Sequence, residues 1–242
     1  MRRATTTLLI ALVGHAATAG AVETSVPADD PRVTRWEQDV AALEALDRGA
    51  PPAGEILFIG SSSVRLWTTI AHDMAPWPAV GRGYGGARYR DLCHFVPRLV
   101  VNHEPDAIVV FVANDLAAPA EGQTVDTVMV DVRATHARIR ERHPRVPLLF
   151  IAITPTESRW AMWPEIQRLN AAMQRMCEAS DDTFFIATAE QFLDPDTGRP
   201  DPALFRADRL HLSPAGYRVW ARVIAAALDG AVGRVGLESA AP

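Results

Sequence analysis

Short runs of consecutive apolar residues alternate along the chain with longer segments in which apolar residues recur every three or four positions. The continuous runs are typical of buried parallel strands, and the longer spacing is typical of amphipathic helices. Strands that alternate with helices predict a parallel sheet with helices on both faces, a three-layer α/β domain. The predicted strands are residues 56–59, 79–82, 107–112, 148–153 and 183–187, and the predicted helices are residues 34–47, 87–101, 125–143, 164–178 and 214–228.

Start and stop signals lie at the ends of several of these segments. Thr34 and Glu37 have the spacing of a capping box, so the first helix is expected to begin at this threonine. Gly49 and the pair Pro51-Pro52 are expected to end it. Pro97 falls inside the second predicted helix, which it is expected to kink or divide.

The composition fits one domain with a full core, since 48% of the 242 residues are hydrophobic and 22% are charged. Residues 34–230 are expected to form this domain, and they contain no internal repeat. Residues 20–33 are rich in Pro, Asp and small side chains and are expected to form a flexible lead. Residues 231–242 are expected to be a frayed tail.

The first 19 residues have the organisation of a signal peptide. Arg2 and Arg3 form a basic start, residues 8–13 form a short apolar core, and Ala17-Thr18-Ala19 fits a cleavage site, with Ala19-Gly20-Ala21 as a second candidate. A membrane anchor is the alternative, and the shortness of the apolar core argues against it. We therefore expect an exported protein, either periplasmic or secreted.

Charge and cysteine content narrow the possible partners. The net charge of −5 and the lack of a long basic run argue against nucleic acid. No segment after residue 19 is apolar enough to insert stably into a membrane. Cys93 and Cys177 can pair in an oxidising compartment, but both fall on apolar faces of predicted helices, which favours unpaired thiols. Scattered His and Asp residues show no metal-ligand spacing, and the sequence carries no signal for an oligomeric state.

Candidate chemistry gathers where the predicted strands end. The carboxyl ends of the strands form the edge at which open α/β sheets bind ligands. Each group there has a plainer interpretation when taken alone: a polar turn, a glycine turn, a strand-ending turn or a capped helix start. The groups are Ser61–Ser63 after the first strand, Gly83–Gly86 after the second, Asn114-Asp115 after the third, and Asp208 with His211 before the last helix.

Together these groups supply what ester cleavage requires. A serine hydroxyl needs a base to take its proton, and the base needs an acceptor on its far ring nitrogen. Asp208 and His211, three residues apart, satisfy that need. The oxyanion needs preorganised donors, which the Gly86 N–H and the Asn114 side-chain amide can provide.

Four short segments resemble, in order, the conserved blocks of the SGNH (GDSL-type) hydrolases. The resemblance spans about residues 34–228. It implies a flavodoxin-like α/β/α sandwich with a mostly parallel five-stranded sheet in the order 2-1-3-4-5, and no cofactor. In that order, one helix separates the helices that carry the two cysteines. The segments are Gly60-Ser61-Ser62-Ser63, Gly83-Tyr84-Gly85-Gly86, Val112-Ala113-Asn114-Asp115 and Asp208-Arg209-Leu210-His211.

The resemblance also implies roles for single residues. Ser62 takes the position of the nucleophile, with His211 as base and Asp208 as the acid beside it. The oxyanion hole is formed by the N–H groups of Ser62 and Gly86 and by the side chain of Asn114.

The chain departs from the family pattern at three positions. Ser61 stands where the family usually has Asp, Val112 where it usually has Gly, and Gly81 where it often has Asn. The stretch GSSSVRLW, residues 60–67, looks like a variant of the first block, and Ser61 is expected to cap the following turn. None of these changes removes a group that moves a proton or binds the oxyanion.

These observations predict an exported serine esterase for carboxylic esters. No long apolar lid is evident, which favours a short acyl group, and an O-acetyl esterase acting on carbohydrate fits the predicted location. The alternatives are a lysophospholipase or thioesterase of the same family, and a non-catalytic binding protein, against which the Asp208–His211 pair argues. The side chains expected to line a sugar-binding mouth, unless the tryptophans serve only for packing, are Arg65, Trp67, Trp160 and Trp163, with Arg159.

Overall fold

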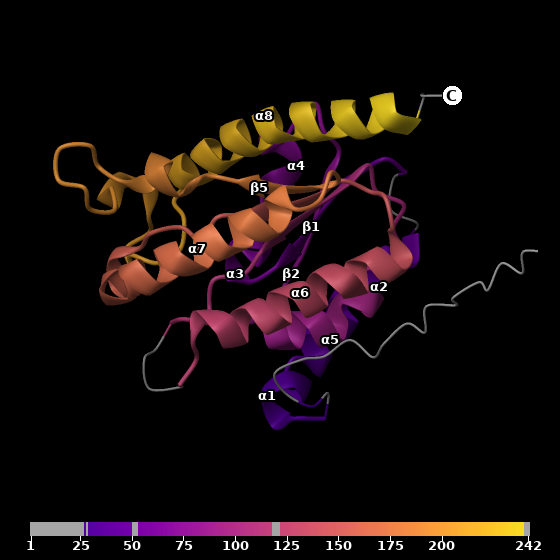
Figure 1. Ribbon diagram of the computed structural model, residues 1–242, viewed down its shortest axis with the longest axis horizontal. Helices are drawn as coiled ribbons and strands as arrows, with labels where there is room; N and C mark the ends of the chain where they lie inside the picture. Colours follow the sequence, from indigo (N-terminus) through magenta and orange to yellow (C-terminus); the bar gives the residue numbers. More distant parts are fainter. Residues whose placement is uncertain (1–26, 28, 50–52, 118–121, 240–242) are drawn as a thin grey trace, which may run out of the picture.

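The computed structural model describes residues 27, 29–49, 53–117 and 122–239. A single sheet lies between two layers of helices (Figure 1). Its five strands are all parallel and lie in the order β2-β1-β3-β4-β5, as the family resemblance implies. The strands are β1 (Ile56–Gly60), β2 (Ala79–Gly83), β3 (Ala107–Phe111), β4 (Leu148–Ile151) and β5 (Thr183–Ile186).

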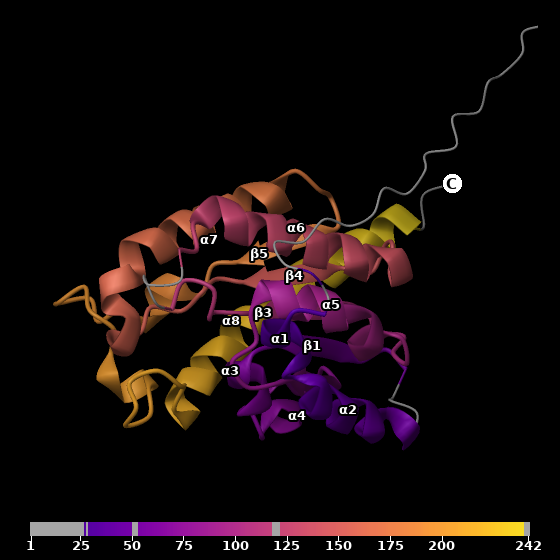
Figure 2. The same cartoon turned by 90° about the horizontal axis from the view of Figure 1, so that it is seen from below.

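The strand positions follow from apolar side chains that are buried on both faces of the sheet. In β1, Leu57 and Ile59 pack toward one helical layer, while Ile56 and Phe58 pack toward the other. Figures 1 and 2 show α5, α6 and α7 over one face and α4 and α8 over the other. The longer helices are α2 (Glu37–Leu46), α5 (Tyr89–Val100), α6 (Val125–Arg142), α7 (Trp163–Glu178) and α8 (Pro214–Ser239); the shorter are α1 (Pro31–Thr34), α3 (Ser62–Arg65) and α4 (Ile70–Asp73).

The start of the domain differs from the sequence prediction. Asp30 caps α1 by accepting the N–H of Arg32 at 2.7 Å, with Pro31 at the first helical position. This earlier turn places Thr34 inside α1, so the predicted capping box does not form, and α2 begins at Glu37 without a side-chain cap. Helical structure therefore begins before residue 34, and Val33 is already buried. The predicted signal peptide and residues 20–26 lie outside the described residues.

Two further helix predictions concern Pro97 and the C-terminal segment. Pro97 does not divide α5, which runs from Tyr89 to Val100 and buries most of its residues against the sheet and α6. In the structure, α8 continues to Ser239, beyond residue 230, where the domain was expected to end. A glycine ends a helix most often by taking a positive φ angle, and Gly230 is not among the described glycines that do so.

Cys93 and Cys177 are both buried and both free, as favoured from the sequence. Within the described residues, no helix combines the length and the hydropathy needed to cross a bilayer.

Candidate active site

The turn after β1 owes its shape to a glycine. Gly60 has a φ angle of +138°, and a Cβ atom there would lie 2.0 Å from the carbonyl oxygen of Phe111 in β3. Only glycine fits so close an approach of two backbones. The Ser61 N–H then donates to the same carbonyl at 2.9 Å, and the chain turns into α3. Ser62 therefore stands at the carboxyl edge of the sheet as the first residue of α3.

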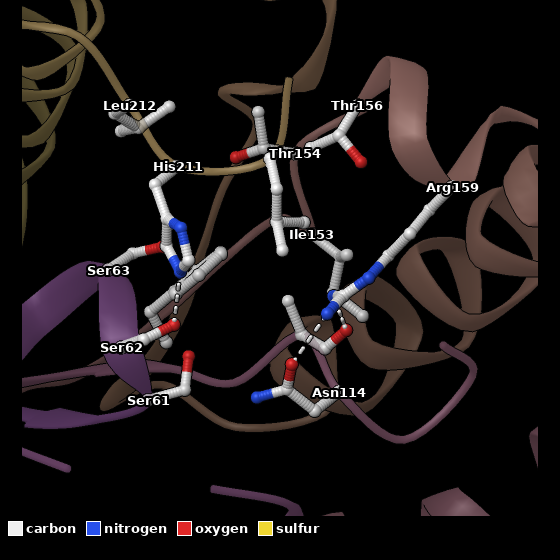
Figure 3. Close-up of a pocket in the computed structure, with 13 residues that line it drawn as sticks. Ser61, Ser62, Ser63, Asn114, Ile153, Thr154, Thr156, Arg159, His211 and Leu212 are labelled. Atoms are coloured by element: carbon white, nitrogen blue, oxygen red, sulfur yellow. Dashed lines mark hydrogen bonds between the residues drawn. The ribbon is translucent and has the colours of Figure 1, made fainter. Parts of the chain in front are cut away.

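A hydrogen-bonded row of three side chains lies at this edge, and Figure 3 shows two of them, Ser62 and His211. The Ser62 Oγ and His211 Nε2 atoms are 3.0 Å apart, and the His211 Nδ1 and Asp208 Oδ2 atoms are 2.7 Å apart. The other carboxylate oxygen, Asp208 Oδ1, accepts the N–H groups of Leu210 and His211, each at 3.0 Å. The short loop from Asp208 to His211 thus fixes the carboxylate against the imidazole ring, and the other ring nitrogen faces Ser62.

The carboxylate fixes the tautomer of the ring. Burial acts to raise the pKa of Asp208, but the hydrogen bonds from the ring and backbone of His211 and from the backbone of Leu210 lower it to about 2. The carboxylate is therefore ionised at neutral pH and can only accept at Nδ1. Nδ1 of His211 carries the proton, which leaves Nε2 free to accept from the Ser62 hydroxyl.

Asn114 lies on the opposite side of the same cavity (Figure 3). Its Nδ2 donates to the carbonyl oxygen of Ala87 at 2.8 Å. Its Oδ1 accepts from Arg159 Nη2 at 2.7 Å, while Arg159 Nη1 donates to the carbonyl oxygen of Ala113 at 2.6 Å. Arg159 belongs to the 3₁₀ helix η3 (Glu157–Met162) that precedes α7.

Gly86 takes a conformation that favours glycine. Its φ angle is +71°, and an added Cβ atom would lie 3.1 Å from the Trp36 ring. Gly86 precedes Ala87, whose carbonyl oxygen accepts the hydrogen bond from the Asn114 amide. Gly86 is not among the residues that line the cavity.

The cavity in front of Ser62 is narrow. Its volume is about 20 Å³, while a single water molecule needs roughly 10–15 Å³. Thr154 and Thr156 also line it, and their hydroxyls are buried without a hydrogen-bond partner among the described residues. The full lining comprises Ser61, Ser62, Ser63, Phe111, Ala113, Asn114, Ile153, Thr154, Thr156, Arg159, Leu210, His211 and Leu212.

Ser61 does not cap α3 as expected. It occupies the N-cap position, but its side chain makes no capping hydrogen bond. The N–H groups of Val64 and Arg65 bond instead to its main-chain carbonyl, at 3.0 and 3.2 Å. The residue lines the cavity beside Ser62.

The tryptophans predicted to bind substrate do not line the cavity. Trp67 is 2% exposed, donates to Asp73 at 2.8 Å and stacks on Tyr217. It is therefore a core residue, and its predicted contact with substrate is wrong. Trp163, the first residue of α7, is buried in the core, and the half-buried Trp160 stacks on it.

Arg65 is exposed and faces Gly85, and it also lies outside the lining of the cavity. The sequence analysis missed Thr154 and Thr156 and placed Arg159 only at the edge of the site. A usable signal was present, because all three lie within six residues after the end of a predicted strand, at the sheet edge that carries the other site residues.

A metal centre finds no support in the part of the chain that the structure describes, which holds no group of three or more His, Cys, Asp or Glu side chains suited to bind an ion.

Comparison with known proteins adds a family and a fold. The model of the GDSL-like lipase/acylhydrolase family matches residues 56–219, more than half of the chain. No curated protein matches the sequence significantly.

Several solved structures have a similar fold. A Streptococcus pneumonia protein provisionally assigned as a platelet activating factor is 21% identical, with a TM-score of 0.71 over 81% of this chain and 94% of its own. A GDSL-like lipase from Bacteroides thetaiotaomicron is 18% identical, with a TM-score of 0.64 over 82% and 98%. A family 3 carbohydrate esterase from Talaromyces cellulolyticus is 14% identical, with a TM-score of 0.53 over 74% and 98%.

Proposed function

Because the chain belongs to the GDSL-like lipase/acylhydrolase family of ester hydrolases, we propose that it is a serine esterase that cleaves carboxylic esters through an acyl-enzyme. The observation that carries this proposal is the row Ser62–His211–Asp208, with atoms 3.0 and 2.7 Å apart beside a cavity. No cofactor takes part in the proposed reaction.

In the first half of the reaction, Ser62 Oγ attacks the ester carbonyl carbon while His211 Nε2 takes the hydroxyl proton. Asp208 orients the ring and stabilises the imidazolium. The tetrahedral intermediate collapses, and the imidazolium gives its proton to the departing alcohol. In the second half, His211 takes a proton from water, the hydroxide attacks the acyl carbon, and the acid is released as Ser62 regains its proton.

The proposed oxyanion hole consists of the N–H groups of Ser62 and Gly86 and the side-chain amide of Asn114. The hydrogen bond from Asn114 to Ala87 O supports this assignment, because it ties the amide to the loop that carries Gly86. One hydrogen of the Asn114 amide group bonds to Ala87, and the second remains for the substrate oxygen.

The narrow cavity favours a short acyl group such as acetyl. The sequence also has no long apolar lid segment that could enclose the long acyl chain of a lysophospholipase or thioesterase substrate. Thr154 and Thr156 favour a polar substrate, because a buried hydroxyl without a partner is costly and a substrate hydroxyl can satisfy it. We therefore favour O-acetyl ester hydrolysis on a carbohydrate.

The predicted signal peptide places this reaction in the periplasm or outside the cell. N-terminal sequencing of the protein from its native host tests this part of the proposal: a mature chain beginning after residue 19 or 21 supports export. A chain that still begins at Met1 contradicts it.

The proposed chemistry is tested by hydrolysis of p-nitrophenyl acetate through octanoate, with purified wild-type protein and Ser62→Ala side by side. We expect rates that fall with chain length and vanish in Ser62→Ala. We also expect Asn114→Ala to lower kcat by about 10²–10³. Turnover that survives in Ser62→Ala would make Ser61 or Ser63 the next candidate nucleophile. Absence of both turnover and fluorophosphonate labelling would favour the non-catalytic binding protein.

A further inference from the structure

The side chain of Asn114 has a fixed orientation that it cannot hold by itself. An amide group presents an acceptor on one side and donors on the other, and rotation by 180° exchanges them. Catalysis at an oxyanion requires the NH₂ group to face the substrate. The two protein neighbours of the amide therefore decide whether Asn114 presents a donor or an acceptor to the cavity.

Those neighbours allow only one orientation. Arg159 Nη2 lies 2.7 Å from Asn114 Oδ1, and a guanidinium has donors only. The carbonyl oxygen of Ala87 lies 2.8 Å from Nδ2, and a carbonyl has no donor. A rotated amide would set N–H against N–H and oxygen against oxygen. The pair of contacts thus keeps the NH₂ group in the donor position.

Arg159 is itself held in place at two points. Its second terminal nitrogen, Nη1, donates to the main-chain oxygen of Ala113 at 2.6 Å. The planar guanidinium therefore binds the backbone of Ala113 and the side chain of Asn114 at the same time. The following residue, Trp160, stacks on Trp163 with ring centroids 6.0 Å apart, which anchors η3 to the core. Figure 3 shows the guanidinium beside Asn114, across the cavity from His211.

The cation also changes the strength of the donor. Burial, followed by the nearby Arg88, lowers the pKa of Arg159, but a guanidinium remains protonated at working pH. A positive charge at the amide oxygen draws electron density from the amide nitrogen and makes its N–H groups stronger donors.

From these contacts we infer that Arg159 is a positioning residue that orients and polarises the Asn114 amide for the oxyanion. This inference rests on the proposed esterase function. It places Arg159 in contact with Asn114 rather than with the reacting atoms, and so its effect on the rate passes through that amide.

A double-mutant cycle on p-nitrophenyl acetate tests the inference, using wild type, Arg159→Met, Asn114→Ala and the double variant. Methionine keeps an unbranched apolar stem and removes the guanidinium with its charge and both hydrogen bonds. We expect Arg159→Met alone to lower kcat about 10–100-fold, within the loss expected for a single oxyanion donor, with KM changed less than about threefold. In the Asn114→Ala background, the same change should lower kcat by less than about threefold.

Two further variants test the role of the charge and control for a general effect of losing an arginine. Arg159→Lys keeps the charge but donates from a single point, and its kcat should lie between wild type and Arg159→Met. Arg168→Met is the matched control, because Arg168 is an exposed α7 residue paired with Glu165, and its kcat should equal that of wild type. The inference would be overturned if the fold-loss of kcat in the double variant equalled the product of the two single losses. A wild-type kcat in Arg159→Met would overturn it as well.

Urea unfolding of the four proteins in the cycle separates this inference from the proposed function. If wild type shows no Ser62-dependent turnover, the esterase proposal fails and the catalytic role of Arg159 fails with it. The unfolding cycle then still reports whether Arg159 and Asn114 are coupled. If wild type is active and the unfolding cycle shows coupling but the kinetic cycle does not, Arg159 is structural only and the inference is wrong.

Discussion

Asp115, the residue after Asn114, is a buried acid whose ionisation opposes folding. Its side chain is fully enclosed and accepts the N–H of Tyr89 at 3.1 and 3.3 Å, at the first position of α5. Burial raises the pKa of this carboxyl from 3.8 to about 7, against the opposing effect of the Tyr89 N–H and with help from Asp91 and Asp131. The perturbation that tests this is Asp115→Asn, which removes the charge and keeps an oxygen for Tyr89.

The sign of the effect follows from proton binding. Between pH 3.8 and about 7, the folded protein holds a proton on Asp115 that the unfolded chain has lost. The contribution of Asp115 to the free energy of unfolding therefore falls as pH rises through this range and levels off above it. Displacing a pKa from 3.8 to about 7 corresponds to about 4 kcal/mol, since each pH unit contributes 1.36 kcal/mol.

Urea unfolding of wild type and Asp115→Asn between pH 4 and 8 measures this term. The new amide is a buried donor that costs about 1–3 kcal/mol at every pH, so the test is the change in the difference between the two proteins. That difference should move in favour of Asp115→Asn by up to about 4 kcal/mol as pH rises. Asp229→Asn, an exposed change on α8, is the control and should run parallel to wild type. Parallel curves for Asp115→Asn would refute the reasoning.

Three further predictions follow from the burial of single side chains. Trp67→Phe should lower the free energy of unfolding by about 1–3 kcal/mol through its lost hydrogen bond, while the ratio of rates on acetyl and butyryl esters stays constant; a changed ratio would return Trp67 to the substrate site. Thr154→Val and Thr156→Val should each lower kcat/KM on glycerol monoacetate about 3–10-fold and leave propyl acetate unaffected; equal losses on both esters would exclude a role in recognising hydroxyls. Burial raises the pKa of Cys93 to about 11 and that of Cys177 to about 12, so iodoacetamide at pH 8 should label neither thiol in the folded protein and both in urea without reductant.

The sheet was predictable because its signals are local. A strand buried on both faces is apolar throughout, and the runs at Ile56 and Ala107 needed no knowledge of their neighbours. Helix ends were less predictable because competing signals lie close together. The helical turn that begins at Asp30 and Pro31 formed in place of the predicted Thr34 capping box. No local sequence feature shows which of these two helix starts is the more stable.

The candidate site divides in the same way. Ser62, Asn114 and His211 were predicted because parallel topology carries strand ends to one edge, and the family resemblance then assigned their roles. Trp67 was misplaced because its position in sequence, five residues after Ser62, does not reveal that α8 covers it. The hydrogen bond from Arg159 to Asn114 joins residues 45 positions apart, and it depends on side-chain directions that hydrophobic patterns do not encode.

The segment between β4 and α7 connects the two halves of the site. Arg159 holds Asn114 on one side, and the Ser158 N–H donates to the carbonyl oxygen of Arg209 at 3.3 Å on the other. Arg209 lies between Asp208 and His211 and has a φ angle of +54°, a left-handed conformation that persists only where neighbouring contacts hold it. Neighbouring residues of η3 thus support both the proposed oxyanion donor and the loop of the acid and base. Because η3 contacts both sides of the cavity, a change in its length should displace Asn114 and His211 relative to each other while leaving the sheet intact.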